Sequence, residues 1–313
     1  MSNASPDLEI PDLEILRRRI DEIDDRLQDL LIERMAIVSR VADQKQRSGG
    51  VAPHQPAREA EILRRLVARN SGGLPAASLV RIWRELLAAT TRTQGAFTIA
   101  VYVPPAGPGF WDIARDHYGS HTPMLAFGSA TQVIRAVAEG RATVGVLPMP
   151  QEEETDPWWR HLLSTREAAP HVISRLPFGG RGNARSDSGD ALAIGRGAQL
   201  ATGRDRTLIA TENAPNISRG RLFSTLSGLD LRCTFIASSE HAEGGSTLIE
   251  IDGFVSADDP RLDRFRAQLG AAVYRLLPLG GYAVPLSASE LSPGGSSGVS
   301  ARAAIAAGAA ARG

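Results

Sequence analysis

The sequence is poor in residues that cross-link a chain or hold a metal. Its 313 residues include one cysteine, Cys233, which excludes an intrachain disulfide and a cysteine-based metal site. The 35 Lys and Arg residues balance 35 Asp and Glu residues, so no net charge would attract nucleic acid or an anionic membrane. No apolar run approaches the length of a membrane span. Residues 1–11 lack a basic start and an apolar run, so we expect no secretory signal and a soluble, cytoplasmic protein.

The stretch 13–46 contains neither Gly nor Pro, and its apolar residues recur at alternating three- and four-residue spacing. That period is typical of one long amphipathic helix, for which Asp12 is a suitable N-cap. The helix would span roughly 50 Å. Because a small monomeric fold cannot bury an apolar face of that length, we expect the helix to pack against partner helices. The apolar face comprises Leu13, Leu16, Ile20, Ile23, Leu27, Leu30, Leu31, Ile37, Val38 and Val41.

Arg34 interrupts this apolar face. A buried charge is costly unless it is paired, so Arg34 either extends its charged end to the surface or binds an anionic ligand. Lys45 follows nearly on the same face, about 16 Å away, close enough for both cations to hold one small dianion. Arg17 lies about 25 Å from Arg34 along the helix. If Arg17 binds the same kind of ligand, it must do so in another subunit of a two-fold dimer.

Pro and Gly residues divide the rest of the chain into two shorter helices and two segments that mix strands with helices. The helices are expected over 56–69 and 75–95. From 97 to 148 the pattern is β-α-β-α-β, which indicates a small parallel sheet. From 206 to 285 it is β-α-β-β-α-β, the order of a ferredoxin-like unit. Residues 287–313 are mostly Ser, Gly and Ala, and we expect them, like residues 1–11, to be disordered.

Charged and apolar residues of the helical part occur together in a specific order. They read Leu16-Arg17-x2-Ile20, Leu30-Leu31-x-Glu33-Arg34, Val41-x3-Lys45, Arg58-Glu59, Ile82-Trp83-Arg84-Glu85-Leu86 and Thr90-x3-Gln94. In this order residues 12–96 resemble the all-helical class of chorismate mutase. Taken singly, Arg17, Lys45 and Arg58 would be ordinary surface charges, and their joint spacing is what favours a functional role.

The resemblance implies a homodimer that rearranges chorismate to prephenate and needs neither cofactor nor metal. It implies that Arg17 of one subunit, with Arg34 and Arg58 of the other, surrounds the substrate carboxylates. Lys45 and Gln94 would donate to the ether oxygen of the substrate, and Glu59 would accept from its ring hydroxyl. Thr90 stands where the family often has Ser, and Gln55 replaces a common Asp. The implied catalytic residues are Arg34, Lys45 and Gln94, and the implied substrate-binding residues are Arg17, Arg34, Lys45, Gln55, Arg58, Glu59, Thr90 and Gln94.

The segment 97–148 carries a Gly107-x-Gly109 turn after its first expected strand and resembles the first lobe of a prephenate dehydratase. We expect the second lobe to be missing, because only a short polar stretch separates Pro177 from Thr207. The counterpart of the Thr-Arg-Phe motif of that family is Asp205-Arg206-Thr207. The ferredoxin-like segment resembles the regulatory ACT module of phenylalanine-sensitive dehydratases, which implies an amino-acid effector.

We therefore expect a multidomain protein with an all-α chorismate mutase domain, an α/β region and a ferredoxin-like α+β ACT-like module. The expected bounds are 1–11 (tail), 12–96, 97–204, 205–286 and 287–313 (tail). The predicted function is chorismate mutase in phenylalanine and tyrosine biosynthesis. Two alternatives stay open, a bifunctional chorismate mutase/prephenate dehydratase and a non-catalytic dimer that senses an amino acid. The histidines of the α/β region lack metal-ligand spacing, and Trp158-Trp159 is interpreted as a packing pair.

Overall fold

The computed structural model describes residues 12–47, 52–152, 154, 157–163, 169–197, 199–215, 217–241 and 244–292. The chain divides into two compact units, one ending at Pro53 and the other beginning at His54. The predicted tail over 1–11 and most of the one over 287–313 lie outside the described residues. None of the helices within these ranges combines the length and the apolar character that crossing a bilayer requires.

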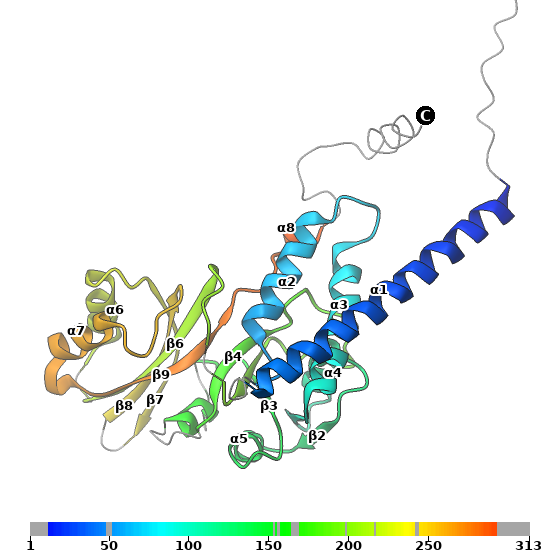
Figure 1. Ribbon diagram of the computed structural model, residues 1–313. Helices are drawn as coiled ribbons and strands as arrows, with labels where there is room; N and C mark the ends of the chain where they lie inside the picture. The colour runs from blue at the N-terminus through cyan, green and yellow to red at the C-terminus, as the bar shows by residue number, and fades with distance from the viewer. Residues whose placement is uncertain are drawn as a thin grey trace, which may run out of the picture. The chain divides into compact units, whose positions relative to one another are not determined.

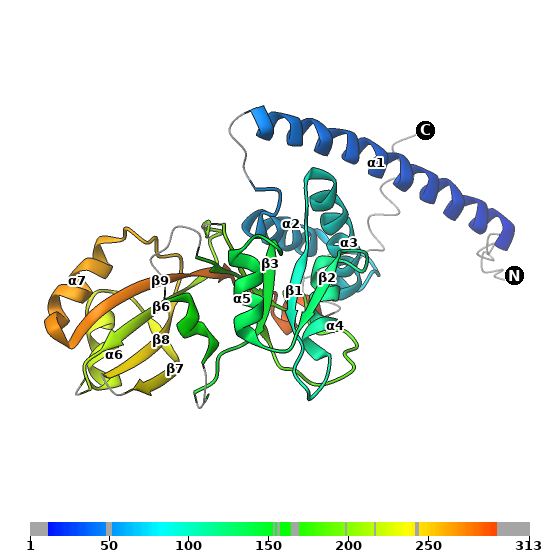
Figure 2. The same cartoon turned by 90° about the horizontal axis from the view of Figure 1, so that it is seen from below.

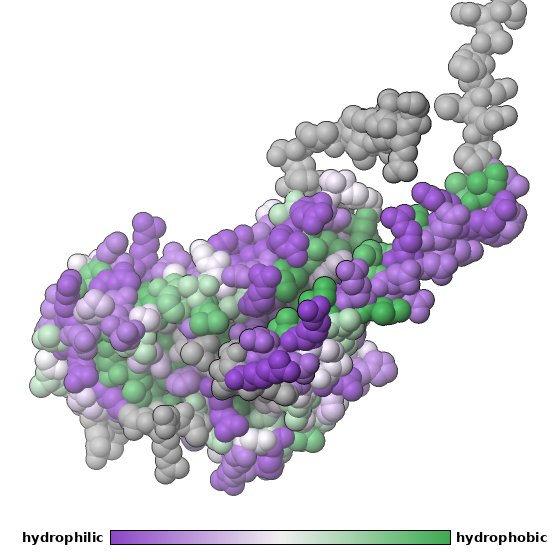
Figure 3. All heavy atoms as spheres, viewed as in Figure 1, coloured by the Kyte–Doolittle hydropathy of each residue, from purple (hydrophilic) through white to green (hydrophobic). Residues whose placement is uncertain are grey.

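The first unit is described by one helix, α1 (Leu13–Arg47), shown in blue in Figure 1. The Glu14 amide donates to Asp12 Oδ1 at 3.2 Å, so the predicted cap is confirmed. The apolar face of α1 is exposed, with Ile20 at 57%, Leu27 at 53% and Leu30 at 59%. Figure 3 shows apolar side chains on the surface of this helix among hydrophilic ones. The packing of this face against partner helices, expected from the sequence, stays a prediction.

The helices α2 (Pro56–Arg69) and α3 (Ala76–Gln94) end close to where the sequence predicts. Both belong to the second unit. Leu63 of α2 and Val80 of α3 pack in one core with Phe178 and Leu286, which lie far along the chain. The compact units thus divide near residue 53, whereas the sequence suggests a domain boundary near residue 96.

Nine strands within the described ranges form one mixed sheet in the order β2-β1-β3-β5-β4-β9-β6-β8-β7. Figure 2 shows β1, β2 and β3 in one part of this sheet and β6, β7 and β8 in the other. The strands are β1 (Ile99–Tyr102), β2 (Met124–Phe127), β3 (Val144–Pro148), β4 (His171–Leu176), β5 (Ala191–Gly195), β6 (Asp205–Asn213), β7 (Cys233–His241), β8 (Gly244–Asp252) and β9 (Val273–Ala283).

The first part of the sheet contains the predicted parallel unit. β1 pairs in parallel with β2 and β3, and the connections contain α4 (Gly109–Tyr118) and α5 (Ala130–Ala138). Strands β5 and β4 follow in antiparallel pairing, and neither was predicted. The parallel unit is therefore confirmed, but it is one edge of a larger sheet and not a separate small one.

The second part of the sheet is the predicted ferredoxin-like unit. Its strands lie in the order β9-β6-β8-β7, with α6 (Arg219–Gly228) and α7 (Pro260–Leu269) in the connections. Phe265 and Leu226 lie in the core between these helices and the sheet. Trp158 and Trp159, on the short 3-10 helix η1 (Trp158–Leu162), are buried against other side chains of the sheet. The Trp pair is thus a packing pair, as the sequence indicates.

Strand β9 joins the two parts of the sheet, because its Gly280 lies opposite Val172 of β4. Gly280 has a φ of 92°, and a Cβ added there would collide with the Val172 backbone. A left-handed conformation against a neighbouring strand is the combination that only glycine accommodates without strain.

The prediction of disorder is wrong for residues 287–292, where the structure has the helix α8 (Ala288–Leu291). Ser287 and Glu290 form a capping box, and the Leu286 amide donates to the Phe178 carbonyl at 2.8 Å. The Ser-x-x-Glu pattern of a capping box is present in the sequence, but the Ser, Gly and Ala residues that follow it led to the prediction of disorder.

Candidate active site

Three of the predicted site residues lie on α1. Arg17 is exposed, and its Nη1 donates to Glu14 Oε1 at 2.6 Å. Arg34 and Lys45 are half-buried and lie on nearly the same face of the uninterrupted helix. The helix separates Arg17 from Arg34 by about 25 Å, so these two guanidinium groups cannot converge on one small ligand.

The predicted residues of α2 differ sharply in exposure. Arg58 is 68% exposed and its Nη1 pairs with Glu61 Oε2 at 3.0 Å. Glu59 is only 12% exposed, and its Oε2 accepts a hydrogen bond from Arg84 Nη1 at 2.8 Å. Gln55 precedes the helix, and its carbonyl oxygen accepts from the Glu59 amide at 3.0 Å. The start of α2 thus presents one exposed cation and one buried carboxylate.

Thr90 and Gln94 lie one turn apart near the end of α3. Gln94 Nε2 donates to the Thr90 carbonyl at 3.1 Å, and Thr90 Oγ1 donates to the Leu86 carbonyl at 2.7 Å. A side-chain amide carries two N–H groups, so Gln94 can keep this bond while it donates to a ligand.

Two buried residues that the sequence did not single out surround Glu59. Arg84 is 4% exposed and His54 is 8% exposed, and His54 Nε2 lies 3.9 Å from Glu59 Oε1. The His54 ring also packs against Phe97, at 5.2 Å between centroids, and against Tyr118, at 5.7 Å. A usable signal existed in the sequence, because Arg84 interrupts the apolar face of α3 between Val80 and Leu87, much as Arg34 interrupts that of α1.

Burial sets the ionisation of this cluster. It lowers the pKa of His54 below 6.5, while the nearby Glu59 charge acts against this and the Arg84 charge acts with it. Burial, then the Arg84 and His54 charges, lowers the pKa of His117 well below 6.5. Burial also lowers the pKa of Arg84, and Glu59 opposes the shift. At neutral pH both imidazoles are therefore neutral.

A second candidate pocket lies at the carboxyl end of β1. It has a volume of about 460 Å³ and is lined by Gly107, Phe110 and Ser186 among others. The loop between β4 and β5 forms part of its wall. The Arg185 amide of this loop donates to Asp112 Oδ2 at 2.7 Å. A Cβ added to Gly107 would touch Ser186 Oγ, so the loop lies directly on the glycine turn.

The counterpart of the Thr-Arg-Phe motif has a structural role at the start of β6. Thr207 Oγ1 donates to the Gly253 carbonyl and accepts from the Val255 amide, both at 2.9 Å. Asp205 Oδ2 accepts from the Thr202 amide at 2.7 Å. Across the described ranges, no group of three or more His, Cys, Asp or Glu side chains is arranged to hold a metal ion.

Comparison with known proteins identifies the helical part. Residues 16–95 match the family model "Chorismate mutase type II". The bifunctional chorismate mutase/prephenate dehydratase of Pseudomonas aeruginosa is 30% identical over 157 residues, covering 49% of this chain and 42% of the relative. The protein with the same name from Neisseria gonorrhoeae is 30% identical over 154 residues, covering 49% of this chain and 40% of the relative.

Among solved structures, prephenate dehydratase in complex with L-Phe from Arthrobacter aurescens is 12% identical. The match covers 69% of this chain and 100% of that one, with a TM-score of 0.44. The chain spans less than half the length of the curated relatives that it matches. The resemblance predicted from the charged and apolar residues of the helices is confirmed: residues 16–95 are a chorismate mutase type II domain.

Proposed function

We propose that this protein is a chorismate mutase that acts as a homodimer without metal or cofactor. The observation that carries the proposal is that all eight predicted site residues lie within residues 16–95, which match the chorismate mutase type II family. The role in aromatic amino-acid biosynthesis and the cytoplasmic location expected from the sequence belong to the same proposal.

The reaction is a unimolecular rearrangement of a flexible dicarboxylate, so the catalyst must fold the substrate and hold it. Arg17, Arg34 and Arg58 supply guanidinium groups, which pair with carboxylates through two parallel hydrogen bonds. Holding both carboxylates fixes the enolpyruvyl arm over the ring. Such orientation lowers the barrier because it removes the entropy cost of reaching the reactive shape.

The ether oxygen gains negative charge as its C–O bond breaks. Lys45 and Gln94 are the donors proposed to stabilise that charge, one as an ammonium group and one as an amide. Because these donors gain strength as the charge develops, they act on the transition state more than on the bound substrate. Glu59 accepts from the ring hydroxyl, and Thr90 contributes a hydroxyl next to Gln94.

A second copy of the chain is the partner proposed for α1. The exposed apolar face of the helix supports this, since it would be buried against helices of another subunit. The separation of Arg17 from Arg34 supports it too, because each helix would then supply cations to two equivalent sites.

The direct test is turnover of chorismate by the purified full-length chain. Arg34→Ala and Lys45→Ala should each abolish turnover while the helical circular dichroism stays unchanged. Arg26→Ala, which changes a cation of α1 outside the proposed site, serves as the matched control and should stay active. Full activity in the Arg34 or Lys45 variant would overturn the assignment.

A second candidate is the bifunctional chorismate mutase/prephenate dehydratase, favoured by the names of the relatives. The counterpart of the Thr-Arg-Phe motif counts against it, because Asp205 and Thr207 are engaged in hydrogen bonds at the start of β6. Formation of phenylpyruvate from prephenate at neutral pH would establish this activity, and no product from active mutase would exclude it.

An amino-acid effector is proposed for the ferredoxin-like unit. A pocket of about 230 Å³ there is lined by Asn213, Arg219 and Thr247 among others. Asn213 is 3% exposed, and its Oδ1 has no hydrogen-bond partner among the described residues. A buried acceptor of this kind suits an ammonium group. Calorimetry with phenylalanine, tyrosine and tryptophan should give heat with at least one, and no heat with any of them would contradict the proposal.

A further inference from the structure

We propose that Arg84 is the positioning residue for Glu59, and that Phe178 holds Arg84 in place from outside the chorismate mutase type II domain. The proposal rests on the proposed function and adds that the mutase site of this chain depends on the α/β region. Arg84 contacts Glu59, which the proposed function places against the ring hydroxyl of the substrate, so the role proposed for Arg84 is positioning.

The ion pair between Arg84 and Glu59 is almost completely enclosed. Arg84 Nη1 lies 2.8 Å from Glu59 Oε2, and the two side chains are 5% and 12% exposed. Separating a buried ion pair leaves an uncompensated buried charge, and this free-energy cost holds the two side chains in one geometry. Because the guanidinium engages Oε2, the carboxylate is fixed in its rotation and Oε1 is presented to the other side, towards His54 at 3.9 Å.

The Phe178 ring packs against the Arg84 guanidinium, which in turn holds the Glu59 carboxylate. Arg84 Cζ lies 5.2 Å from the centroid of the Phe178 ring, in cation–π contact. Phe178 follows β4 closely in the sequence and is 4% exposed. Its neighbour Gly179 approaches α3 so closely that an added Cβ would collide with the Val80 side chain. The segment after β4 is thus packed tightly against α3, with its aromatic ring on Arg84.

This arrangement determines the orientation in which the Glu59 carboxylate is available to a substrate. The rotamer of Glu59 is set by Arg84, and the position of Arg84 is set by a ring that residues 16–95 do not contain. The Glu59 side chain keeps 12% of its surface exposed. Through this part, a carboxylate held in one orientation would accept a hydrogen bond from a ring hydroxyl with little loss of side-chain freedom. Without the α/β region, the same helix would present a carboxylate with several accessible orientations.

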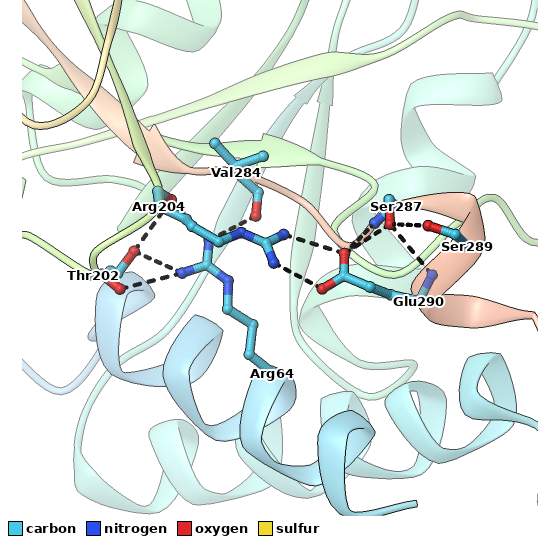
Figure 4. Close-up of polar contacts among 7 residues, drawn as sticks. All are labelled: Arg64, Thr202, Arg204, Val284, Ser287, Ser289 and Glu290. Atoms are coloured by element: carbon cyan, nitrogen blue, oxygen red, sulfur yellow. Dashed lines mark hydrogen bonds and ion pairs between the residues drawn. The ribbon is translucent and has the colours of Figure 1, made fainter. Parts of the chain in front are cut away.

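Arg64 provides the matched control, because it contacts the same ring through a different set of bonds. Its Cζ lies 5.8 Å from the Phe178 centroid. Its hydrogen bonds run to Thr202 and to the carbonyl oxygens of Arg204 and Val284, as Figure 4 shows. Removing Arg64 therefore weakens the attachment of α2 without removing the cation on Glu59.

The test compares kcat/KM of the full-length variants Arg84→Met, Glu59→Gln, their double variant, Arg84→Lys, Phe178→Leu and Arg64→Ala at a temperature where all are folded. Arg84→Met should lower kcat/KM about ten- to hundredfold, as expected for a misplaced site group.

The double variant should be no more than about twofold below Glu59→Gln, because the two residues act as one unit. Arg84→Lys should recover part of the loss, and Phe178→Leu should lose several-fold.

Arg64→Ala should unfold at lower urea concentration but keep kcat/KM within about twofold of the wild type. Arg84→Met within twofold of the wild type would overturn the proposal, as would losses that multiply in the double variant. A purified wild type that does not consume chorismate would overturn the proposed function itself. An active wild type with unaffected Arg84 variants would overturn only the positioning role of Arg84.

Discussion

Arg64 Nη2 of α2 donates to the carbonyl oxygen of Val284 at 2.7 Å, across 220 positions of the sequence. The same nitrogen donates to the Arg204 carbonyl at 2.8 Å, and Nη1 donates to Thr202 Oγ1 at 2.8 Å. One guanidinium thus joins a helix of the chorismate mutase type II domain to both ends of the ferredoxin-like unit, just before β6 and just after β9 (Figure 4).

Replacing Arg64 should therefore destabilise the second unit. Hydrogen bonds from a charged donor are each worth about 1.5–3 kcal/mol, and part of this is recovered by water at a half-exposed site. We expect Arg64→Ala to lower the free energy of unfolding by about 2–3 kcal/mol in urea titration. Arg65→Ala, on the next residue of α2, is the control and should change it little. Equal stability of Arg64→Ala and wild type would contradict the role of this contact.

The pair between Arg204 and Glu290 should give an acid-sensitive contribution to stability. Hydrogen bonds from Arg204 lower the pKa of Glu290 from 4.5 to about 2. A carboxylate whose pKa is depressed in the folded state stabilises that state fully above its unfolded pKa. The contribution is then lost as the pH falls from about 4.5 towards 2. The stability difference between wild type and Glu290→Gln should be largest near neutral pH and shrink over that window. A difference that is constant with pH would contradict this assignment.

The buried histidines should weaken the fold on mild acidification. Burial lowers the pKa of both His54 and His117 below 6.5 in the folded state, so the unfolded chain binds protons first. Stability should therefore decrease as the pH falls below 6.5. Replacing His117 by Phe removes one titrating group and should make stability depend less steeply on pH. Urea unfolding at a series of pH values from about 7 to about 5 measures this dependence. His121→Phe is the control, and an unchanged slope in the His117 variant would contradict the account.

The proposed dimer makes a distinct prediction about mixed subunits. Arg17→Ala and Arg34→Ala should each be inactive alone, because each lacks one carboxylate-binding group in every site. If Arg17 acts across the interface, a mixed dimer has one site with both arginines intact. Statistical mixing should then restore about a quarter of wild-type activity. If both arginines served the same subunit, every site would stay defective, and no activity would return on mixing.

Local patterns in the sequence were sufficient for the elements that carry their own signals. The bounds of α2 and α3 follow from periodicity and from Pro and Gly residues, and the ferredoxin-like order follows from the alternation of strands and helices. Strands β4 and β5 were not predicted because they are short and flank a polar, glycine-rich loop. Their strand character depends on pairing with each other, with β3 and with β9, which a local pattern does not contain.

The candidate site shows the same limit. Arg34 was noticed because it interrupts an apolar face, and Arg84 carries a similar signal on α3. Its partner Glu59 lies 25 positions away, and the ring that holds it, Phe178, lies beyond the helical domain altogether. Sequence spacing can indicate that a charge needs a partner, but the partner is chosen by tertiary packing.

The most direct test of the central claim follows the absorbance of chorismate with the purified full-length protein, and then assays the products. We expect that chorismate disappears, that prephenate accumulates, and that Arg34→Ala abolishes the loss. Chorismate that stays stable in the presence of folded, dimeric protein would contradict the proposed mutase activity.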